Sequence, residues 1–177
     1  MWVMLLDSKA AATDVIKHHQ TAMEKECGRK LRLLRTNNSG EFTVAEFVAY
    51  CADEGIQRHY SATYSPQQNG VVERRNQTVV AAARALLKQR GMPAVYWGEA
   101  VMTAVHLLNR SPTSALDGKT PYEAWHGRKP AVSYLRIFGC LAFVKELNHV
   151  GKLDDRNSRG SSSATLKGLW PIACSTR

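Results

Sequence analysis

The sequence predicts an α/β domain, because short apolar runs alternate with longer stretches of helical periodicity. Residues 2–6 and 31–35 are two such runs, and residues 56–62 form a third that alternates weakly. Helical stretches at residues 7–27 and 43–54 fill the intervals between them. A strand, helix, strand order predicts a parallel pair with a right-handed crossover between residues 2–6 and 31–35. The 177 residues, 44% of them apolar, are enough to bury a sizeable core.

The first two predicted helices carry their own boundary signals. Asp7 and Ser8 are suited to cap the first helix, and Gly28 is suited to stop it after Cys27. The second helix is expected to end at Gly55. Its apolar residues fall on one face and predict a buried stripe. That stripe consists of Val44, Phe47, Val48 and Cys51.

The second half of the chain predicts a polar loop, two more helices and a strand. The loop covers residues 64–70, a long helix runs from Val71 to about Arg90, and a further helix covers residues 96–110. A short strand is expected at residues 141–144. Each helix has a predicted core stripe. On the long helix it is Val72, Val79, Ala83 and Leu86, and on the next it is Trp97, Val101, Ala104, Val105 and Leu108.

Charge and hydropathy narrow the possible functions. A formal charge of +9 and a pI near 9.6 favour a polyanionic partner such as DNA. No apolar run has the length needed to span a bilayer, and the N-terminus lacks the pattern of a signal peptide, so we expect a nuclear or cytoplasmic protein with no membrane partner. The four cysteines are widely spaced and predict reduced thiols, with neither a zinc site nor a disulfide framework.

Two motifs carry the chemistry. The first is RTNNSGEF at residues 35–42, directly after a predicted strand, and the second is YSPQQNGVVERRN at residues 64–76. Together they resemble the integrase catalytic core of copia-type retrotransposons, a branch of the ribonuclease H-like superfamily. In that family an Asp stands where this chain has Asn37, and a Glu follows with thirty-five residues between them, which is the position of Glu73. Residues 119–130 and 135–140 are similar to the region beyond the copia-type core.

The resemblance implies a metal-dependent polynucleotidyl transferase site. Such sites hold two Mg²⁺ or Mn²⁺ ions between carboxylates, because the metal pair must polarise both the attacking and the leaving oxygen at a phosphate. The family's first catalytic Asp lies on a strand expected ahead of residue 2, so the fold class is a ribonuclease H-like integrase core lacking its first strands. Asn37 keeps an amide oxygen but lacks the carboxylate charge. Glu73 is then the one metal ligand that survives, and productive metal binding is not expected.

DNA contacts are predicted around the second motif. The helix that carries Glu73 also carries an excess of basic residues, although exposed helix faces are often basic without binding anything. The polar loop before it can hydrogen-bond phosphates or bases. The candidate DNA-binding residues are Arg74, Arg75, Gln67, Gln68, Asn69 and Lys88.

Three segments are expected. Residues 1–112 form a partial integrase core, residues 113–157 a copia-type extension, and residues 158–177 a disordered or frame-shifted tail rich in serine. The favoured function is that of an integrase fragment whose parent activity is DNA integration and which is itself inactive. Integrases generally work as multimers, so a homo-oligomer is also expected.

Two alternatives stay open. One is a DNA-binding or assembly module without catalysis, which would bind DNA in a salt-dependent but metal-independent way. The other is an active metal-dependent nuclease in which Asp7 or Glu41 replaces the missing carboxylate. It ranks last, since one secure carboxylate does not hold two metals.

Overall fold

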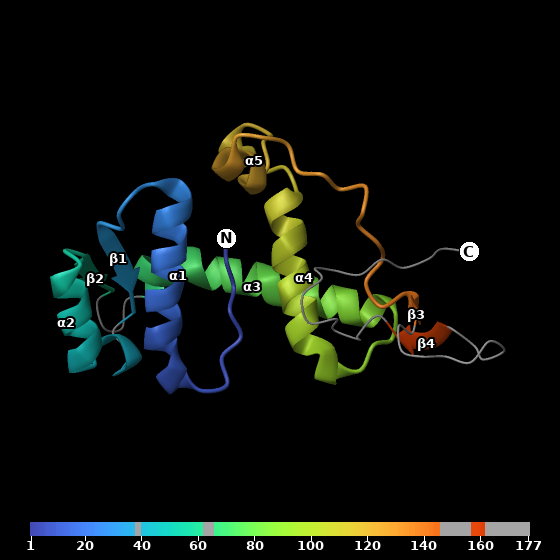
Figure 1. The fold of residues 1–177 in the computed structure, drawn as a ribbon, viewed down its shortest axis with the longest axis horizontal. Coiled ribbons are helices and arrows are strands. Elements are labelled where there is room, and N and C mark those ends of the chain that lie inside the picture. Colours follow the sequence, from blue (N-terminus) through green and yellow to red (C-terminus); the bar gives the residue numbers. More distant parts are fainter. Residues whose placement is uncertain (38–39, 62–65, 146–156, 162–177) are drawn as a thin grey trace. The chain divides into compact units, whose positions relative to one another are not determined.

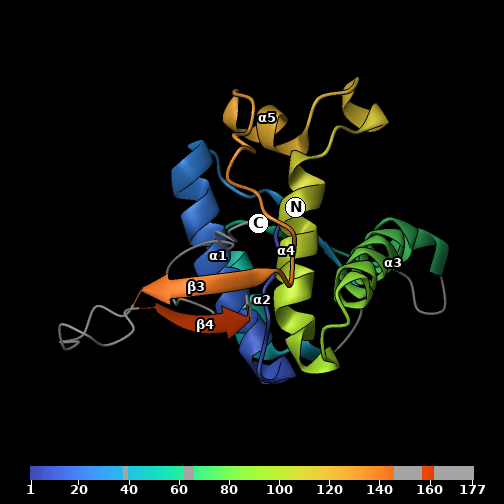
Figure 2. The same cartoon turned by 90° about the vertical axis from the view of Figure 1, so that its right-hand side faces the viewer.

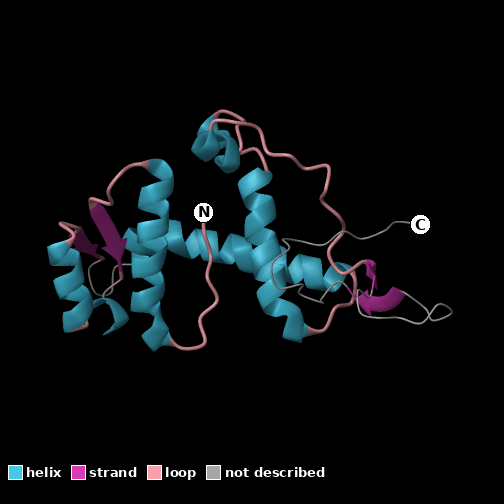
Figure 3. Ribbon diagram, viewed as in Figure 1, coloured by secondary structure: helices cyan, strands magenta, loops and turns pink. Residues whose placement is uncertain are grey.

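The computed structural model describes residues 1–37, 40–61, 66–145 and 157–161 (Figure 1). The chain forms two compact units. We call residues 4–76 the N-terminal unit, and residues 1–3 together with 77–177 the C-terminal unit. Helices predominate among the described residues (Figure 3). Helix α3, Pro66–Gln89, is continuous and contributes to both units.

The N-terminal unit has two helices packed beside a parallel pair of strands (Figure 1). Strands β1 and β2 pair in parallel, with Leu33 opposite Gln57. The bounds of these elements are α1, Ala12–Cys27; β1, Leu33–Thr36; α2, Ala45–Asp53; and β2, Gln57–Tyr60. A 3-10 turn, Lys9–Ala11, precedes α1. The helices end where the sequence predicts, because Gly28 and Gly55 adopt the left-handed conformation with φ of 65° and 68°.

The core of the N-terminal unit forms around Phe47 and Cys51 of α2, which are 1% and 0% exposed. Ile56 is buried with them, and Ile16 of α1 and Leu34 of β1 pack against the group. Val44 is 50% exposed, so its predicted place in the buried stripe of α2 is wrong. Val44 is the residue before the helix, where the chain is extended, and helical periodicity does not apply to it.

The predicted first strand is also wrong. Residues 2–6 have no regular secondary structure, and the side chains of Trp2, Met4, Leu5 and Leu6 are 40–51% exposed. The parallel crossover therefore joins β1 to β2 through α2, instead of joining residues 2–6 to residues 31–35 through α1. An apolar run predicts a strand only where a partner strand is there to pair with it, and the described β1–β2 sheet has two strands.

The C-terminal unit is built on α4, Trp97–Arg110, which crosses the C-terminal half of α3 (Figures 1 and 3). Ala83 of α3 meets Ala100 and Ala104 of α4, and Phe138 closes the group. Small side chains at this crossing let the two helices approach closely. Val79, Ala83, Ala104 and Val105 are buried as predicted. Val72 and Trp97 are 51% and 58% exposed, so their predicted core positions are wrong.

A short helix and a hairpin complete the C-terminal unit. Helix α5, Pro121–His126, has Thr120 as its N-cap and Gly127, with φ 69°, at its C-terminal end. Strands β3, Leu141–Lys145, and β4, Asn157–Ser161, pair antiparallel (Figure 2). The first residues of the segment predicted to be a tail, 158–161, therefore belong to a strand, and residues 162–177 lie outside the described residues.

The cysteines differ from one another. Cys27 is an exposed free thiol and Cys51 a buried one. Cys140 is disulfide-bonded, so the expectation of a reduced thiol is wrong for this residue.

Candidate catalytic position and nucleic-acid interface

Asn37 lies at the carboxyl end of the parallel strand pair. It directly follows Thr36, the last residue of β1, and the Thr36 carbonyl accepts a hydrogen bond from the Ser61 amide at 3.0 Å. The Asn37 side chain is exposed. Crevices at the carboxyl ends of parallel strands are where open α/β sheets place their ligands. Asn37 therefore lies at the carboxyl end of β1, and its role in a site stays a prediction.

Glu73 lies two turns into α3, and its side chain is exposed. Asn37 and Glu73 both belong to the N-terminal unit. Their oxygens are one amide and one carboxylate, with a formal charge of −1 between them. A pair of divalent cations requires several carboxylates to offset its charge and to fill its coordination sphere. The two side chains do not fit a two-metal site.

The substitute carboxylates do not complete such a site. Asp7 is exposed in the segment before α1, and Glu41 is half-buried in the 3-10 turn Gly40–Phe42. The backbone carbonyl of Glu41 accepts a hydrogen bond from the Thr13 hydroxyl at 3.4 Å. Among the residues that the structure describes, no three His, Cys, Asp or Glu side chains gather in a group that could hold a metal ion. The nuclease alternative stays a prediction.

The basic residues of α3 are all exposed, as a DNA-contacting role requires. Arg74 and Arg75 lie in the N-terminal unit, and Arg84 and Lys88 in the C-terminal unit. At 100° per residue, Arg84 and Lys88 lie on one side of α3, opposite the buried Val79 and Ala83. Glu73 is the single acidic residue between Pro66 and Gln89. Helix α3 therefore exposes more cations than anions.

The polar residues before Val71 are helical. Residues 66–70 form the first turn of α3, so the predicted loop is wrong for this part, and residues 62–65 lie outside the described residues. Pro66 explains the early start, because proline suits the first turn of a helix. The side chains of Gln67, Gln68 and Asn69 also lie outside what the structure describes. Their predicted DNA contacts stay a prediction.

A buried polar network in the C-terminal unit was not predicted from the sequence. His106 of α4 is 8% exposed, and its Nε2 lies 2.9 Å from the Tyr134 hydroxyl. Arg110 Nη1 lies 3.1 Å from His106 Nδ1. Because a guanidinium only donates, Nδ1 accepts, and the neutral ring carries its proton on Nε2 and donates to Tyr134. The periodicity gave no signal for it, because at 100° per residue His106 falls on the side of α4 opposite the predicted core stripe.

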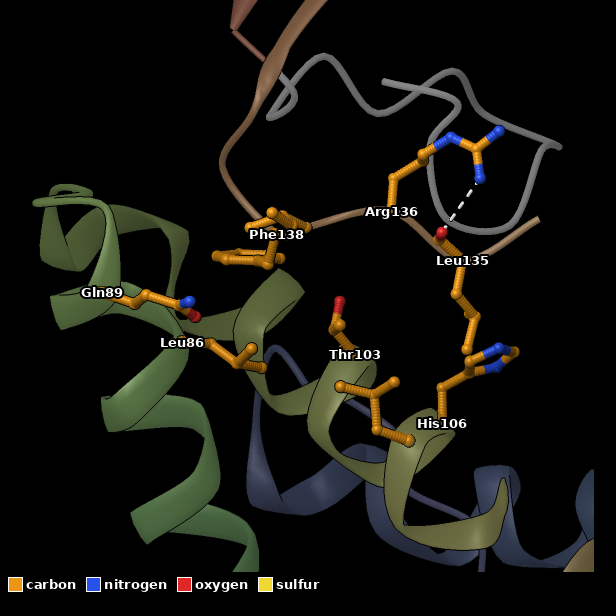
Figure 4. Close-up of a pocket in the computed structure, with 9 residues that line it drawn as sticks. Leu86, Gln89, Thr103, His106, Leu135, Arg136 and Phe138 are labelled. Carbon is orange, nitrogen blue, oxygen red and sulfur yellow. Dashed lines mark hydrogen bonds between the residues drawn. The ribbon is translucent and has the colours of Figure 1, made fainter. Parts of the chain in front are cut away.

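Burial, and then the nearby Arg110 guanidinium, lower the pKa of His106 to about 4. The imidazole also borders a cavity of about 160 Å³ (Figure 4). Leu86 and Gln89 of α3, Thr103 of α4 and Phe138 line it with His106, while the Arg136 guanidinium points away from Thr103 and donates to the Leu135 carbonyl at 3.0 Å. The volume is too small for most ligands, and we regard the network as structural.

Several relatives of the chain are Pol polyproteins of plant transposons. The Pol polyprotein of the Nicotiana tabacum transposon TNT 1-94 is 40% identical over 162 residues, covering 89% of this chain and 12% of that protein. The chain belongs to the copia-type retrotransposon Pol polyproteins. The Pol polyprotein of the Arabidopsis thaliana transposon RE2 is 29% identical over 160 residues, covering 89% of this chain and 11% of that protein. No protein-family model matches the chain.

One solved structure is similar to this chain in fold. A structure of the simian T-cell lymphotropic virus intasome, in complex with PP2A regulatory subunit B56 gamma, matches with a TM-score of 0.53. The match covers 89% of this chain and 54% of that chain at 18% identity, and it shows a ribonuclease H-like fold. The fold class predicted from the sequence is thereby confirmed. The chain spans about one-eighth of the length of the first curated relatives that it matches.

A shorter relative is also similar. An uncharacterised mitochondrial protein of Arabidopsis thaliana is 34% identical over 90 residues, covering 51% of this chain and 73% of that protein. Among the residues that the structure describes, no helix of this copia-type core is long and apolar enough to cross a bilayer.

Proposed function

We propose that this integrase-core chain binds DNA through the basic residues of α3 and does not catalyse strand transfer. The observation that carries the proposal is the donor set at the carboxyl end of β1. The amide of Asn37 stands where the family has a carboxylate, and Glu73 is the remaining family ligand. A site with one carboxylate holds two divalent cations too weakly to polarise a phosphate.

The amide weakens metal binding through charge more than through size. An amide oxygen coordinates a hard cation, but the net negative charge of the site falls from −2 to −1 when Asp becomes Asn. Mg²⁺ dehydrates reluctantly, so it needs that charge to exchange its water for protein oxygens. In the parent family Mg²⁺ or Mn²⁺ would polarise the attacking and leaving oxygens. Here the residues do not fit that role.

DNA binding rests on the electrostatics of α3. Arg74, Arg75, Arg84 and Lys88 are exposed, and Glu73 is the single acidic residue on the same helix. Exposed cations release the counterions of a nucleic acid when they neutralise its phosphates, which gives affinity without sequence preference. A nuclear or cytoplasmic location and a homo-oligomeric state belong to the same proposal.

The catalytic half is tested by strand transfer with Mg²⁺ and with Mn²⁺. The unmodified chain, Glu73→Gln, Asn37→Asp and the double variant Asn37→Asp/Glu73→Gln are compared, with an active retroviral integrase as the positive control. We expect no product from the unmodified chain and none from the double variant. Activity in the unmodified chain that Glu73→Gln abolishes would refute the proposal and would show that another carboxylate completes the site.

The binding half is tested by the salt dependence of duplex DNA affinity. Arg84→Glu/Lys88→Glu should weaken binding and lower the slope of log affinity against log salt by about two, because two phosphate contacts are lost. Arg74→Glu/Arg75→Glu tests the other half of α3 in the same way. Lys9→Glu/Lys25→Glu is the matched control, since it makes the same change in net charge on exposed residues before and on α1. Equal losses in all three variants would indicate net charge alone and would contradict a specific role for α3.

A further inference from the structure

We propose that the C-terminal unit carries a second nucleic-acid site, in which a base of single-stranded DNA stacks on the Trp2–Trp125 pair while Arg128 and Lys129 hold the adjoining phosphates. The inference rests on the proposed DNA-binding function and adds a separate surface to it. It depends on three observations: two exposed tryptophans held in contact, a short helix fixed at both ends, and a segment without acidic residues.

The two tryptophans are exposed although they touch each other. Trp2 is 51% and Trp125 42% exposed, and their ring centroids lie 4.9 Å apart with an interplanar angle of 79°. Edge-to-face contact of this kind is a favourable aromatic arrangement, and it leaves part of each ring open to solvent. Exposed aromatic side chains that lie together are typical of sites that bind a ligand or a partner molecule.

Both rings are held in place by groups far apart in the sequence. Asn109 of α4 accepts a hydrogen bond from the Met1 nitrogen at 3.0 Å and donates one to the Met1 carbonyl at 2.6 Å, and so fixes the backbone next to Trp2. Tyr122, one turn before Trp125, lies under the Arg110 guanidinium at 4.8 Å. The pair is therefore positioned before any ligand arrives, which lowers the entropy cost of binding.

Helix α5 is fixed at both ends. The Thr120 hydroxyl accepts from the Glu123 amide at 3.0 Å, and the Gly127 amide donates to the Glu123 carbonyl at 2.9 Å. These caps satisfy backbone groups that a six-residue helix would otherwise expose to water. Trp125 thus sits on a defined element, and the chain turns at Gly127 directly into the basic pair.

The charged residues from Ala124 to Lys145 are all cations. Residues 124–145 include Arg128, Lys129, Arg136 and Lys145 and contain no Asp or Glu. Arg128 and Lys129 are exposed, and no salt bridge joins either to a carboxylate within the described ranges. Cations next to open aromatic rings are the combination by which proteins bind single strands: the rings stack on bases and the cations follow the phosphates.

The expected ligand is a single strand because a duplex hides its base faces. Stacking needs unpaired bases, whereas the basic face of α3 needs only phosphates and serves duplex and single strand alike. The two surfaces should therefore differ in their preference. The α5 site discriminates single-stranded from duplex DNA, and α3 does not.

The test measures the affinity of the full chain for a labelled oligothymidylate and for a duplex of equal length, by fluorescence anisotropy. We expect Trp125→Ala to weaken single-strand binding by about tenfold, Trp125→Phe to restore most of it, and both to leave duplex binding nearly unchanged. Arg128→Glu/Lys129→Glu should weaken single-strand binding and lower its salt slope by about two. Trp97→Ala is the matched control, because Trp97 is 58% exposed but lies at the start of α4.

Each outcome of these binding measurements supports or overturns the proposed single-strand site. Unchanged single-strand affinity in Trp125→Ala and in Arg128→Glu/Lys129→Glu, with a loss in Arg84→Glu/Lys88→Glu, would overturn this site and leave the proposed function standing. Absence of binding to either DNA would overturn both. An equal loss in Trp97→Ala and Trp125→Ala would assign the effect to general aromatic exposure. If circular dichroism shows that Trp125→Ala does not fold, the surface variant Arg128→Glu/Lys129→Glu decides alone.

Discussion

His106 gives a prediction about the stability of the C-terminal unit below neutral pH. Its pKa in the folded protein is about 4, against 6.5 for an ordinary histidine. The unfolded chain therefore binds a proton at a pH where the folded chain does not. The contribution of His106 is fully present above about pH 6.5 and is lost as the pH falls toward about 4. Between about pH 7 and about pH 5, linkage puts the loss at roughly 2 kcal/mol.

The measurement is urea denaturation followed by tryptophan fluorescence at a series of pH values, in the unmodified chain and in His106→Gln. The variant keeps a polar side chain but removes the titrating group. Its absolute stability will also change, because the contacts with Arg110 and Tyr134 are altered, so the comparison is between the two pH dependences. His59→Gln, at an exposed position in β2, serves as the control.

The unmodified chain should lose roughly 2 kcal/mol more than His106→Gln across this interval, and about as much as His59→Gln. Carboxylates with lowered pKa values, such as Glu46 beside Lys17, also lose their stabilisation in acid, but they do so in all three proteins. Parallel curves for the unmodified chain and His106→Gln would show that the buried ring protonates without cost, and the assignment of the network as structural would fail.

Three further predictions concern local structure. Phe47→Ala should destabilise the N-terminal unit by about 3–5 kcal/mol, whereas Val44→Ala, at a 50% exposed position, should change its stability by less than about 0.5 kcal/mol; similar urea midpoints for the two would contradict the core described here. Burial raises the pKa of the Cys51 thiol, so under native conditions it should react with a disulfide reagent far more slowly than the exposed Cys27, and equal rates would show that the core opens readily. Removing the Thr120 cap by Thr120→Ala should cost about 1 kcal/mol in thermal unfolding of the C-terminal unit, and no change would mean that α5 does not depend on it.

Local signals predicted where α1 and α2 end. The predicted cap of α1 at Asp7 and Ser8 is wrong, because residues 9–11 form a 3-10 turn and Ala11 is the N-cap. Gly28 and Gly55 end their helices because a left-handed residue is needed there, and this requirement is visible in the sequence. Phe47 and Cys51 are buried because their spacing of four places them on one face of α2. The parallel pairing of β1 with β2 follows from a helix that connects two apolar runs.

The features that the sequence did not predict depend on contacts between residues far apart in the chain. Residues 2–6 have the composition of a buried strand, but pairing depends on a neighbour that local pattern does not specify. Val72 has the helical phase of a core residue on α3, yet its side chain is 51% exposed. The Asn109 contact with Met1 and the His106 network join residues that no short motif links. For the candidate site, the motifs predicted that Asn37 follows a parallel strand and that Glu73 lies on a helix, but not the solvent exposure of both.

The contact between Met1 and Asn109 spans 108 positions of the chain, and it bears on how the protein acquires its fold. Residues 1–3 belong to the same unit as residues 77–177. In sequence, the N-terminal unit therefore lies between two parts of the C-terminal unit. Residues 1–3 therefore make these contacts only after α4 and α5 have been synthesised. Closing so long a loop is slow and costs chain entropy, whereas the segment 4–76 makes its core from near neighbours. The order of folding is thus set by connectivity: the inserted unit first, and the unit that surrounds it in sequence last.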